Sequence, residues 1–288
     1  MDTFAGDFST LWTLNQRPPI EHLTWDWWWW LVMLDDDEHP MAGKQLMVLW
    51  STKENDQVHI NDVQWMPKGT PGFDDQGAIQ IDGMVCAWWF DGSVMHDEII
   101  AKVCDMVVLP SNHASWPGKE GQGGGAVVPL LEGDCSMGML PDRSQFWLNL
   151  DLSHEAVQSI QLKMTPWNPA MSTAREATAT YLGSLGYDIL RLHGTKVSGT
   201  IDGEEVKGTA YFQKVCVQAP SVPWYWGVLH FSDGSYLDWF LPHLSTTILS
   251  RDHREWKRRD VSHIAVSQGG LFHDAVHGRS ERFKRVRV

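Results

Sequence analysis

Short apolar runs alternate with tight-turn signals along most of the chain. Asp-Gly pairs at 82–83, 91–92, 202–203 and 233–234 separate runs that are rich in Trp, Val, Ile, Leu and Phe. Such pairs favour two-residue hairpin turns because both residues tolerate a positive φ. The pattern predicts a meandering antiparallel all-β protein, with its strongest hairpin signal at Asp202-Gly203.

Helical periodicity is scarce in the sequence. Residues 173–182 and 251–260 are candidates for short helices, although neither has a wide apolar stripe. We therefore expect an all-β chain of two antiparallel β-barrel or β-sandwich domains with few short helices.

Two of the predicted strands are packed with tryptophan. Residues 25–34 read W-D-W-W-W-W-L-V-M-L and lead into an acidic turn, residues 224–231 read W-Y-W-G-V-L-H-F and lead into a second turn, and residues 87–93 form a weaker copy. Each of the seventeen tryptophans needs a large apolar contact area and a partner for its N–H. The clusters indicate aromatic-lined interior space, and their repetition indicates two similar halves.

A boundary between the halves is expected between residues 135 and 150, where a fresh apolar run begins at Phe146. This predicts domains 1–142 and 143–288, the second with a basic C-terminal segment. Each half has about the size of a single eight-stranded ligand-binding barrel.

The net charge of −13 is unevenly spread along the chain. Residues 251–288 hold ten basic and five acidic side chains, a net charge of +5, and the first 250 residues carry −18. An acidic body argues against nucleic acid as the main partner. The basic tail could contact anionic membrane lipid, or it could pair with the acidic body.

The sequence shows neither a membrane span nor a signal peptide. The most apolar window, 25–34, is too short to cross a bilayer and contains Asp26. The start of the chain lacks a basic and then apolar leader. We expect a cytoplasmic protein, with peripheral membrane contact as an alternative, and the sequence leaves the oligomeric state open.

No cofactor or metal is expected. The four cysteines lack paired spacing and are interpreted as reduced, buried thiols. Among the histidines there is no H-x-H spacing, and His96 with Glu98 is spaced to share a strand face.

The motifs at 206–215, 223–227 and 233–234 resemble those of a known family. They read V-K-G-T-A-Y-F-Q-K-V, P-W-Y-W-G and D-G. They are similar to the G-x-A-[YW] strand, the W-x-W strand and the acidic-Gly turn of a two-domain lipocalin-like (calycin) superfamily. That superfamily includes carotenoid 1,2-hydratase (hydroxyneurosporene synthase), the AttH-like proteins and tocopherol cyclase. The resemblance implies two lipocalin-like domains and an apolar, isoprenoid-type ligand.

The chain departs from the hydratase pattern after the aromatic residue of that first motif. Where hydratase-like members carry Asp-His-Asn or a similar cluster, this chain has Phe212, Gln213, Lys214 and Val215. This is closer to the Glu-Lys-Asn of the tocopherol cyclase type. Because a glutamine cannot donate a proton as a carboxylic acid can, any catalytic acid must come from elsewhere.

Two carboxylates are candidates for that acid. If Asp26 faces a cavity, it lies among indoles, and burial there raises a carboxyl pKa and keeps the group protonated. A protonated carboxyl can act as a general acid toward a carbon–carbon double bond, and the indole faces would stabilise the carbocation. Asp238 is a candidate by the same logic. In the alternative interpretation, either Asp caps a turn or accepts a Trp N–H.

The remaining candidate residues would bind the substrate or balance the charge of the catalytic carboxyl group. Side chains alternate along a strand, so the first tryptophan cluster has two faces: Trp25, Trp27 and Trp29 on one, and Asp26, Trp28 and Trp30 on the other. We expect one of these two faces to line a cavity. Lys214 could balance a buried carboxylate, as a third catalytic candidate, or could face solvent. The predicted substrate-binding residues are Trp25, Trp27, Trp29, Tyr211, Gln213, Trp224, Trp226 and His230.

Two functions use the same predicted cavity. One is an enzyme of the lyase or isomerase class that catalyses acid-assisted hydration, cyclisation or isomerisation of an isoprenoid-type substrate. The other is a non-catalytic lipocalin-like carrier of a hydrophobic ligand. A buried Asp that contacts only the ligand would favour the enzyme, and an Asp in a turn or a salt bridge would favour the carrier.

Overall fold

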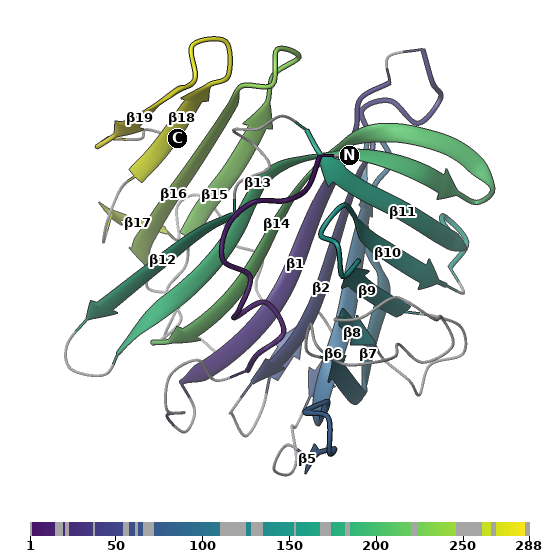
Figure 1. Cartoon of the computed structure of the whole chain (residues 1–288), viewed down its shortest axis with the longest axis vertical. Helices are drawn as coiled ribbons and strands as arrows, with labels where there is room; N and C mark the ends of the chain where they lie inside the picture. The colour runs from purple at the N-terminus through teal and green to yellow at the C-terminus, as the bar shows by residue number, and fades with distance from the viewer. Residues whose placement is uncertain are drawn as a thin grey trace. The chain divides into compact units, whose positions relative to one another are not determined.

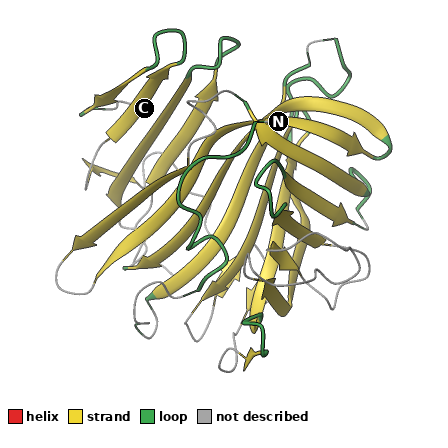
Figure 2. Cartoon of the chain, viewed as in Figure 1, coloured by secondary structure: helices red, strands yellow, loops and turns green. Residues whose placement is uncertain are grey.

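The computed structural model describes most of the chain as β-strands joined by turns (Figure 2). The described residues are 2–14, 20, 23–36, 38–53, 58–60, 63–65, 72–109, 125–127, 135–152, 154–167, 174–181, 185–219, 224–245, 261–265 and 269–285. Within these ranges the structure contains no helix, which confirms the prediction of an all-β protein.

The chain divides into two compact units, Met1–Ala219 and Pro220–Val288. The first unit contains β1 Thr24–Leu34, β2 Gln45–Lys53, β3 Val58–Ile60, β4 Val63–Trp65, β5 Gly72–Phe73, β6 Ile79–Phe90, β7 Met95–Leu109, β8 Gly125–Val127, β9 Cys135–Met139, β10 Phe146–Asp151, β11 Ser159–Pro166, β12 Ala174–Tyr181, β13 Leu185–Ile201 and β14 Glu204–Gln218. The second contains β15 Trp224–His230, β16 Tyr236–Ser245, β17 Val261–Ala265, β18 Gly269–Asp274 and β19 Arg279–Phe283. The division into domains 1–142 and 143–288 stays a prediction; β9 and β10, on either side of that boundary, pair with each other.

The large sheet of the first unit returns on itself. Its strands follow the order β11-β10-β9-β8-β7-β6-β2-β1-β14-β13-β12, and β11 pairs in addition with β13. The long strand β13 makes this closure, because its first half pairs with β12 and its second half pairs with β11. Figure 1 shows β9, β10 and β11 lying across from β1, β2 and β14. The curled sheet therefore has one enclosed face and one outer face.

The Asp202-Gly203 turn joins β13 and β14, as predicted. Asp202 has φ 53° and Gly203 has φ 84°, and positive φ at both central residues is typical of a tight hairpin turn. The turn predicted at Asp82-Gly83 is wrong, since both residues lie inside β6 and pair with β7. A Cβ added at Gly83 would lie 2.9 Å from the Cβ of Met106, so this glycine allows close packing of side chains.

The helix predicted at 173–182 is also wrong. Residues 174–181 form strand β12, which pairs antiparallel with β13 from Ala174↔Leu192 to Tyr181↔Leu185. The Ala, Arg and Glu of this segment favour a helix, but its Thr and Tyr residues favour a strand, and pairing with the neighbouring strand overrides the helical preference. The second candidate helix, 251–260, lies outside the described residues.

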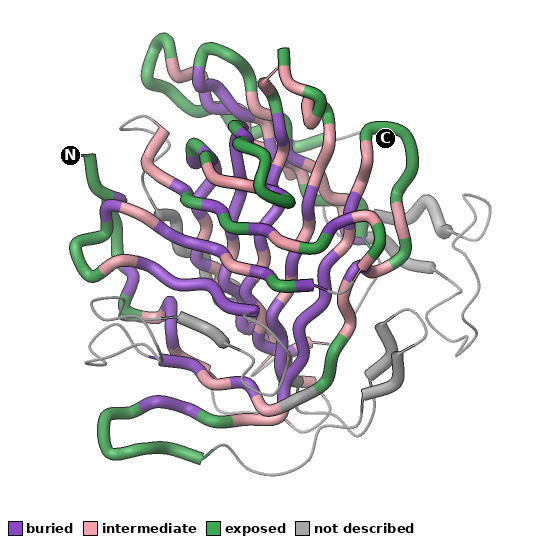
Figure 3. The backbone as a smooth tube through the Cα atoms, turned by 90° about the vertical axis from the view of Figure 1, so that its right-hand side faces the viewer, coloured by how far each residue is buried: buried purple, intermediate pink, exposed green. Residues whose placement is uncertain are grey.

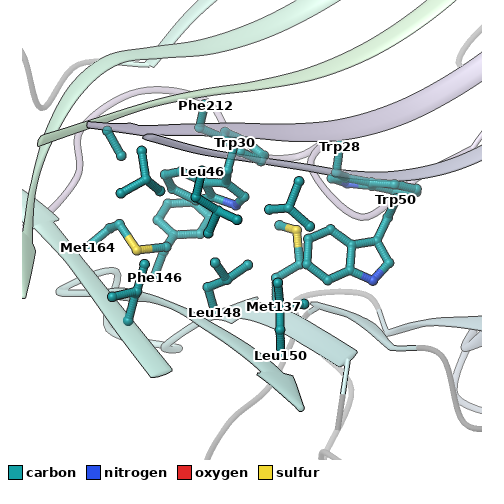
Figure 4. Close-up of a cluster of buried hydrophobic side chains, with 14 of the residues drawn as sticks. Trp28, Trp30, Leu46, Trp50, Met137, Phe146, Leu148, Leu150, Met164 and Phe212 are labelled. Carbon is teal, nitrogen blue, oxygen red and sulfur yellow. The ribbon is translucent and has the colours of Figure 1, made fainter. Parts of the chain in front are cut away.

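The core of the first unit lies on the enclosed face of the sheet. Buried positions follow the middles of the strands, and exposed positions gather at the turns (Figure 3). In Figure 4, side chains of β1, β2 and β14 point toward side chains of β9, β10 and β11; those labelled are Trp28, Trp30, Leu46, Trp50 and Phe212 against Met137, Phe146, Leu148, Leu150 and Met164. The two sides of the curled sheet thus meet through large apolar groups.

The N-terminal segment 2–14 also packs into this core. Its side chains Phe4, Phe8, Leu11 and Trp12 are buried in the same cluster. Trp12 stacks on Trp28 with ring centroids 6.4 Å apart, and the carbonyl oxygen of Leu11 accepts a hydrogen bond from Trp28 Nε1 at 2.6 Å. This segment forms no strand beyond an isolated bridge at Ala5, and apart from backbone contacts such as the hydrogen bond from Phe4 N–H to the Arg143 carbonyl oxygen it is held by its apolar side chains.

The second unit is a small antiparallel sheet of order β15-β16-β18-β19, with β17 paired to β16. The strand predicted at 224–231 is β15, and the predicted turn at 233–234 joins it to β16. Inside this unit, Tyr236 stacks on His273 with ring centroids 5.1 Å apart, and His273 Nδ1 lies 2.9 Å from Ser280 Oγ.

Candidate functional site

The two faces of β1 differ sharply in burial. Asp26, Trp28 and Trp30 face the core and are at most 1% exposed, whereas Trp25, Trp27 and Trp29 on the opposite face are partly exposed. The neighbouring strand explains the difference, because the register Trp28↔Lys214 and Trp30↔Phe212 joins the core-facing side chains of β1 to those of β14.

A buried ion pair lies on the enclosed face. Lys214 Nζ donates a hydrogen bond to Asp26 Oδ1, and the two side chains are 0% and 1% exposed. Lys214 Nζ also lies 3.3 Å from the carbonyl oxygen of Val215 and 4.4 Å from the ring centroid of Trp28. Of the two alternatives for Lys214, the structure shows the one in which it balances a buried carboxylate.

Further polar side chains surround the pair on the same face. In the register, Asp26 lies opposite Thr52 on β2 and opposite Cys216 on β14, and Cys216 lies opposite Asp188 on β13. All of these side chains are buried, and Asp188 is 9% exposed. Next to them, Gln218 Nε2 donates to Thr24 Oγ1 at 3.3 Å. This end of the core face therefore holds two carboxylates and one ammonium group.

Beyond Lys214 the same face is aromatic. Trp30 lies 4.6 Å from Phe212 and 5.4 Å from Phe146, measured between ring centroids, and Phe146 lies 5.4 Å from Phe212. Trp30 is fully buried, and its Nε1 has no hydrogen-bond partner among the described residues. Because a buried indole N–H usually has an acceptor, this donor marks a place where a ligand oxygen could bind.

The other predicted residues of the first unit lie on the outer face. Trp25 and Trp27 have ring centroids 4.8 Å apart, Trp29 lies 6.2 Å from Tyr211, and the Tyr211 hydroxyl donates to Gln213 Oε1 at 3.1 Å. Tyr211 is fully buried and Gln213 partly so. The structure therefore separates these five side chains from Asp26 and Lys214 by the thickness of the sheet.

The predicted residues of the second unit share one face of its sheet. Trp224, Trp226 and His230 alternate along β15, and the register Val228↔Asp238 places Asp238 on the same face. Trp224 is 44% exposed and Asp238 is 7% exposed. The roles predicted for these residues stay predictions.

Three of the four cysteines are buried free thiols, as predicted: Cys86, Cys135 and Cys216. Burial, followed by the negative charge of Glu98, raises the pKa of Cys86 to about 12. In the part of the chain that the structure describes, no three His, Cys, Asp or Glu side chains are grouped closely enough to hold a metal ion. The same part contains no helix long and apolar enough to span a membrane.

Sequence reasoning missed two features of this site. Asp188 was not singled out, although alternation with Leu190 along its strand places it on the core face. The N-terminal segment was also missed, although it carries four large apolar side chains, Phe4, Phe8, Leu11 and Trp12, within nine residues.

Comparison with known proteins supports the fold. No family model matches the sequence, and no curated protein matches it either. Among solved structures, the chain is similar to a protein of Nitrosomonas europaea that has been assigned as an AttH. The two share 14% sequence identity with a TM-score of 0.50, over 91% of this chain and 68% of the other. At that identity the likeness concerns the fold alone, which agrees with the curled antiparallel sheet of the first unit.

Proposed function

We propose that the protein binds an apolar, isoprenoid-type small molecule with a polar end group on the enclosed face of its large sheet. The polar end would lie at Lys214 and Asp26, and the apolar body would lie along Trp28, Trp30 and Phe212. The observation that carries the proposal is the fully buried Lys214–Asp26 pair at the edge of an aromatic core.

Stability does not account for such a pair. Moving two charges out of water costs several kcal/mol for each ion, and apolar residues of similar volume are often as stable or more stable. Buried charged groups gather where a protein binds or transforms a ligand. Large side chains from the two sides of the core point toward one another (Figure 4), so a ligand between them would take the place of a movable group. Trp12, which stacks on Trp28 from a segment that forms no strand, is the candidate.

Binding is favoured over catalysis by the state of Asp26. Its carboxyl accepts a hydrogen bond from Lys214, which is the salt-bridged arrangement expected of a carrier. Acid-assisted hydration, cyclisation or isomerisation is the second candidate. One observation favours it: the Trp28 ring already lies 4.4 Å from an ammonium group, and the same indole face would stabilise a carbocation.

The test uses geranylgeraniol as probe and replaces both charges at once. In the double variant Asp26→Leu/Lys214→Met the core stays apolar, and we expect the fold to be retained and the affinity to fall about 10- to 100-fold. Asp151→Asn, at an exposed carboxylate of the same unit, is the control and should bind as the wild type does. Calorimetry gives the affinity, and native mass spectrometry with organic extraction identifies co-purifying ligand.

Two results would contradict the proposal. One is a wild-type protein that binds neither geranylgeraniol nor a co-purifying isoprenoid. The other is a double variant that binds the probe as the wild type does. Incubation of the wild type with the probe, followed by chromatography of the extract, separates the carrier from the enzyme. A new product that the double variant does not form would favour catalysis.

A further inference from the structure

We propose that one face of the second unit docks on an anionic lipid surface. This surface, the unit-2 apolar face, consists of Tyr225, Leu229, Phe231, Trp239, Phe272 and Phe283. The proposal is independent of the ligand site on the large sheet and needs no isoprenoid.

Strand register places these side chains on one side of the sheet. One cross-strand row runs Leu229↔Leu237↔Phe272↔Glu281, and the next runs Gly227↔Trp239↔Gly270↔Phe283. The turn residue Phe231 joins the first row, since its ring lies 6.2 Å from that of Phe272. Apolar side chains thus extend across all four strands.

Two glycines make part of the unit-2 apolar face flat, because no side chain projects from them. A Cβ added at Gly227 would lie 2.1 Å from the Trp239 ring, so the indole lies directly on that backbone. A Cβ added at Gly270 would lie 3.5 Å from the Phe283 ring and 3.6 Å from the Cβ of Trp239. The two glycines therefore let the large rings lie low against the sheet.

Four large apolar side chains of the face are open to solvent. Tyr225 is 36% exposed, Leu229 47%, Phe231 41% and Phe283 43%. On the other side of the sheet, Val228, Tyr236, Asp238 and His273 are at most 7% exposed, and the large apolar side chains exposed there, Trp224 (44%) and Phe240 (40%), lie toward one end of the β15–β16 pairing. A soluble surface rarely exposes a contiguous group of large apolar side chains without a partner.

Charge identifies the partner as anionic. Residues 220–288 hold ten basic and seven acidic side chains, a net charge of +3, whereas residues 1–219 hold thirteen basic and twenty-nine acidic ones, a net charge of −16. Next to Phe283 the side chains of Arg282, Lys284 and Arg285 are exposed. Alternation along β19 places Glu281 on the side of Phe283 and Arg282 on the opposite side, so the basic charge nearest this face comes from Lys284 and Arg285, which follow the strand. An anionic surface would therefore attract this unit and repel the other.

A lipid surface fits this combination better than a second copy of the chain. Two copies meeting through this face would bring like charges together, whereas a membrane offers an apolar layer beneath anionic head groups. Tyrosine and other amphipathic rings are favoured at that boundary, and each Lys or Arg near an anionic bilayer strengthens partitioning by about fivefold.

The test is vesicle flotation of the full chain. Vesicles of phosphatidylcholine and phosphatidylglycerol in equal parts should carry the protein, and phosphatidylcholine vesicles should carry far less. Leu229→Ser/Phe231→Ser should reduce binding by at least about tenfold, because two exposed side chains lose their apolar contact. Lys284→Gln/Arg285→Gln should reduce it by about 25-fold at low salt. Phe73→Ser, which changes a 70% exposed side chain of the first unit, is the matched control and should bind as the wild type does.

Three outcomes would overturn the proposal. The wild type could fail to float with the phosphatidylglycerol vesicles, or Phe73→Ser could lower binding as much as Leu229→Ser/Phe231→Ser does. Light scattering could also show a dimer that the Leu229→Ser/Phe231→Ser variant abolishes while the vesicles bind nothing, which would assign the face to a second copy. Circular dichroism, expected to be unchanged in all variants, shows that the fold is retained.

Discussion

Replacing Lys214 with methionine leaves Asp26 as a carboxylate enclosed in the core without its ammonium partner. Both side chains are essentially free of solvent, at 0% and 1% exposure, so neither water nor salt screens the loss. Removing one member of a buried pair typically costs about 3–5 kcal/mol. The variant also loses the attraction between the ammonium group and the Trp28 ring, at 4.4 Å. We expect the free energy of unfolding to fall by about 4 kcal/mol.

The double variant Asp26→Leu/Lys214→Met separates the cost of an unpaired charge from the cost of lost packing. With both charges removed, the site becomes apolar like the neighbouring core, and its stability should equal that of the wild type within about 1 kcal/mol or exceed it. The difference between single and double variants is therefore the quantity to measure.

Urea denaturation, followed by tryptophan fluorescence and by far-ultraviolet circular dichroism, gives the free energies of unfolding. Parallel denaturation of Asp238→Asn, which leaves the large sheet unchanged, controls for effects on the other unit. A loss below about 1 kcal/mol in Lys214→Met, or a double variant less stable than the single one, would refute the reasoning.

Three further predictions follow from individual residues. Burial raises the pKa of Cys86 to about 12, so iodoacetamide at pH 8 should leave this thiol unmodified in the native protein and alkylate it in urea, as peptide mass spectrometry would show. Hydrogen bonds from two backbone N–H groups lower the pKa of Asp91 from 3.8 to about 2; the stability that they contribute should be present above pH 3.8 and lost as the pH falls toward 2, and an NMR titration of the carboxyl should give the lowered pKa. Gly227→Val places a side chain where the Trp239 ring lies, and a cost of about 1–3 kcal/mol should appear as faster hydrogen exchange in β15 and β16, with unchanged exchange in β1 and β14.

Strand positions were the most predictable part of the fold. Apolar runs between turn signals predicted β1, β10 and β15, and the Asp202-Gly203 signal predicted the β13–β14 turn, because both depend on a few adjacent residues. Asp82-Gly83 was misinterpreted as a turn for the opposite reason. Its glycine meets Met106, a residue of the next strand, and no local pattern encodes such a long-range contact.

The candidate site was less predictable than the strands that carry it. Alternation separated the Asp26 face of β1 from the Trp25 face, but tryptophans on both faces gave no sign of which one is inside. The partner strand decides this. β14 aligns Lys214 and Phe212 with the Asp26 face, and that face meets β9, β10 and β11 across the core.

This orientation divides the predicted site residues between two environments. A small ligand contacts one face of a sheet, so Asp26 and Lys214 would act with Trp28 and Trp30 rather than with the tryptophans on the outer face. The enclosed face combines charged groups, free of solvent, with aromatic walls, and a molecule with one polar end and an apolar body needs both. The outer face offers partly exposed indoles and the Tyr211–Gln213 hydrogen bond. The buried pair is therefore the feature that makes the enclosed face the stronger candidate.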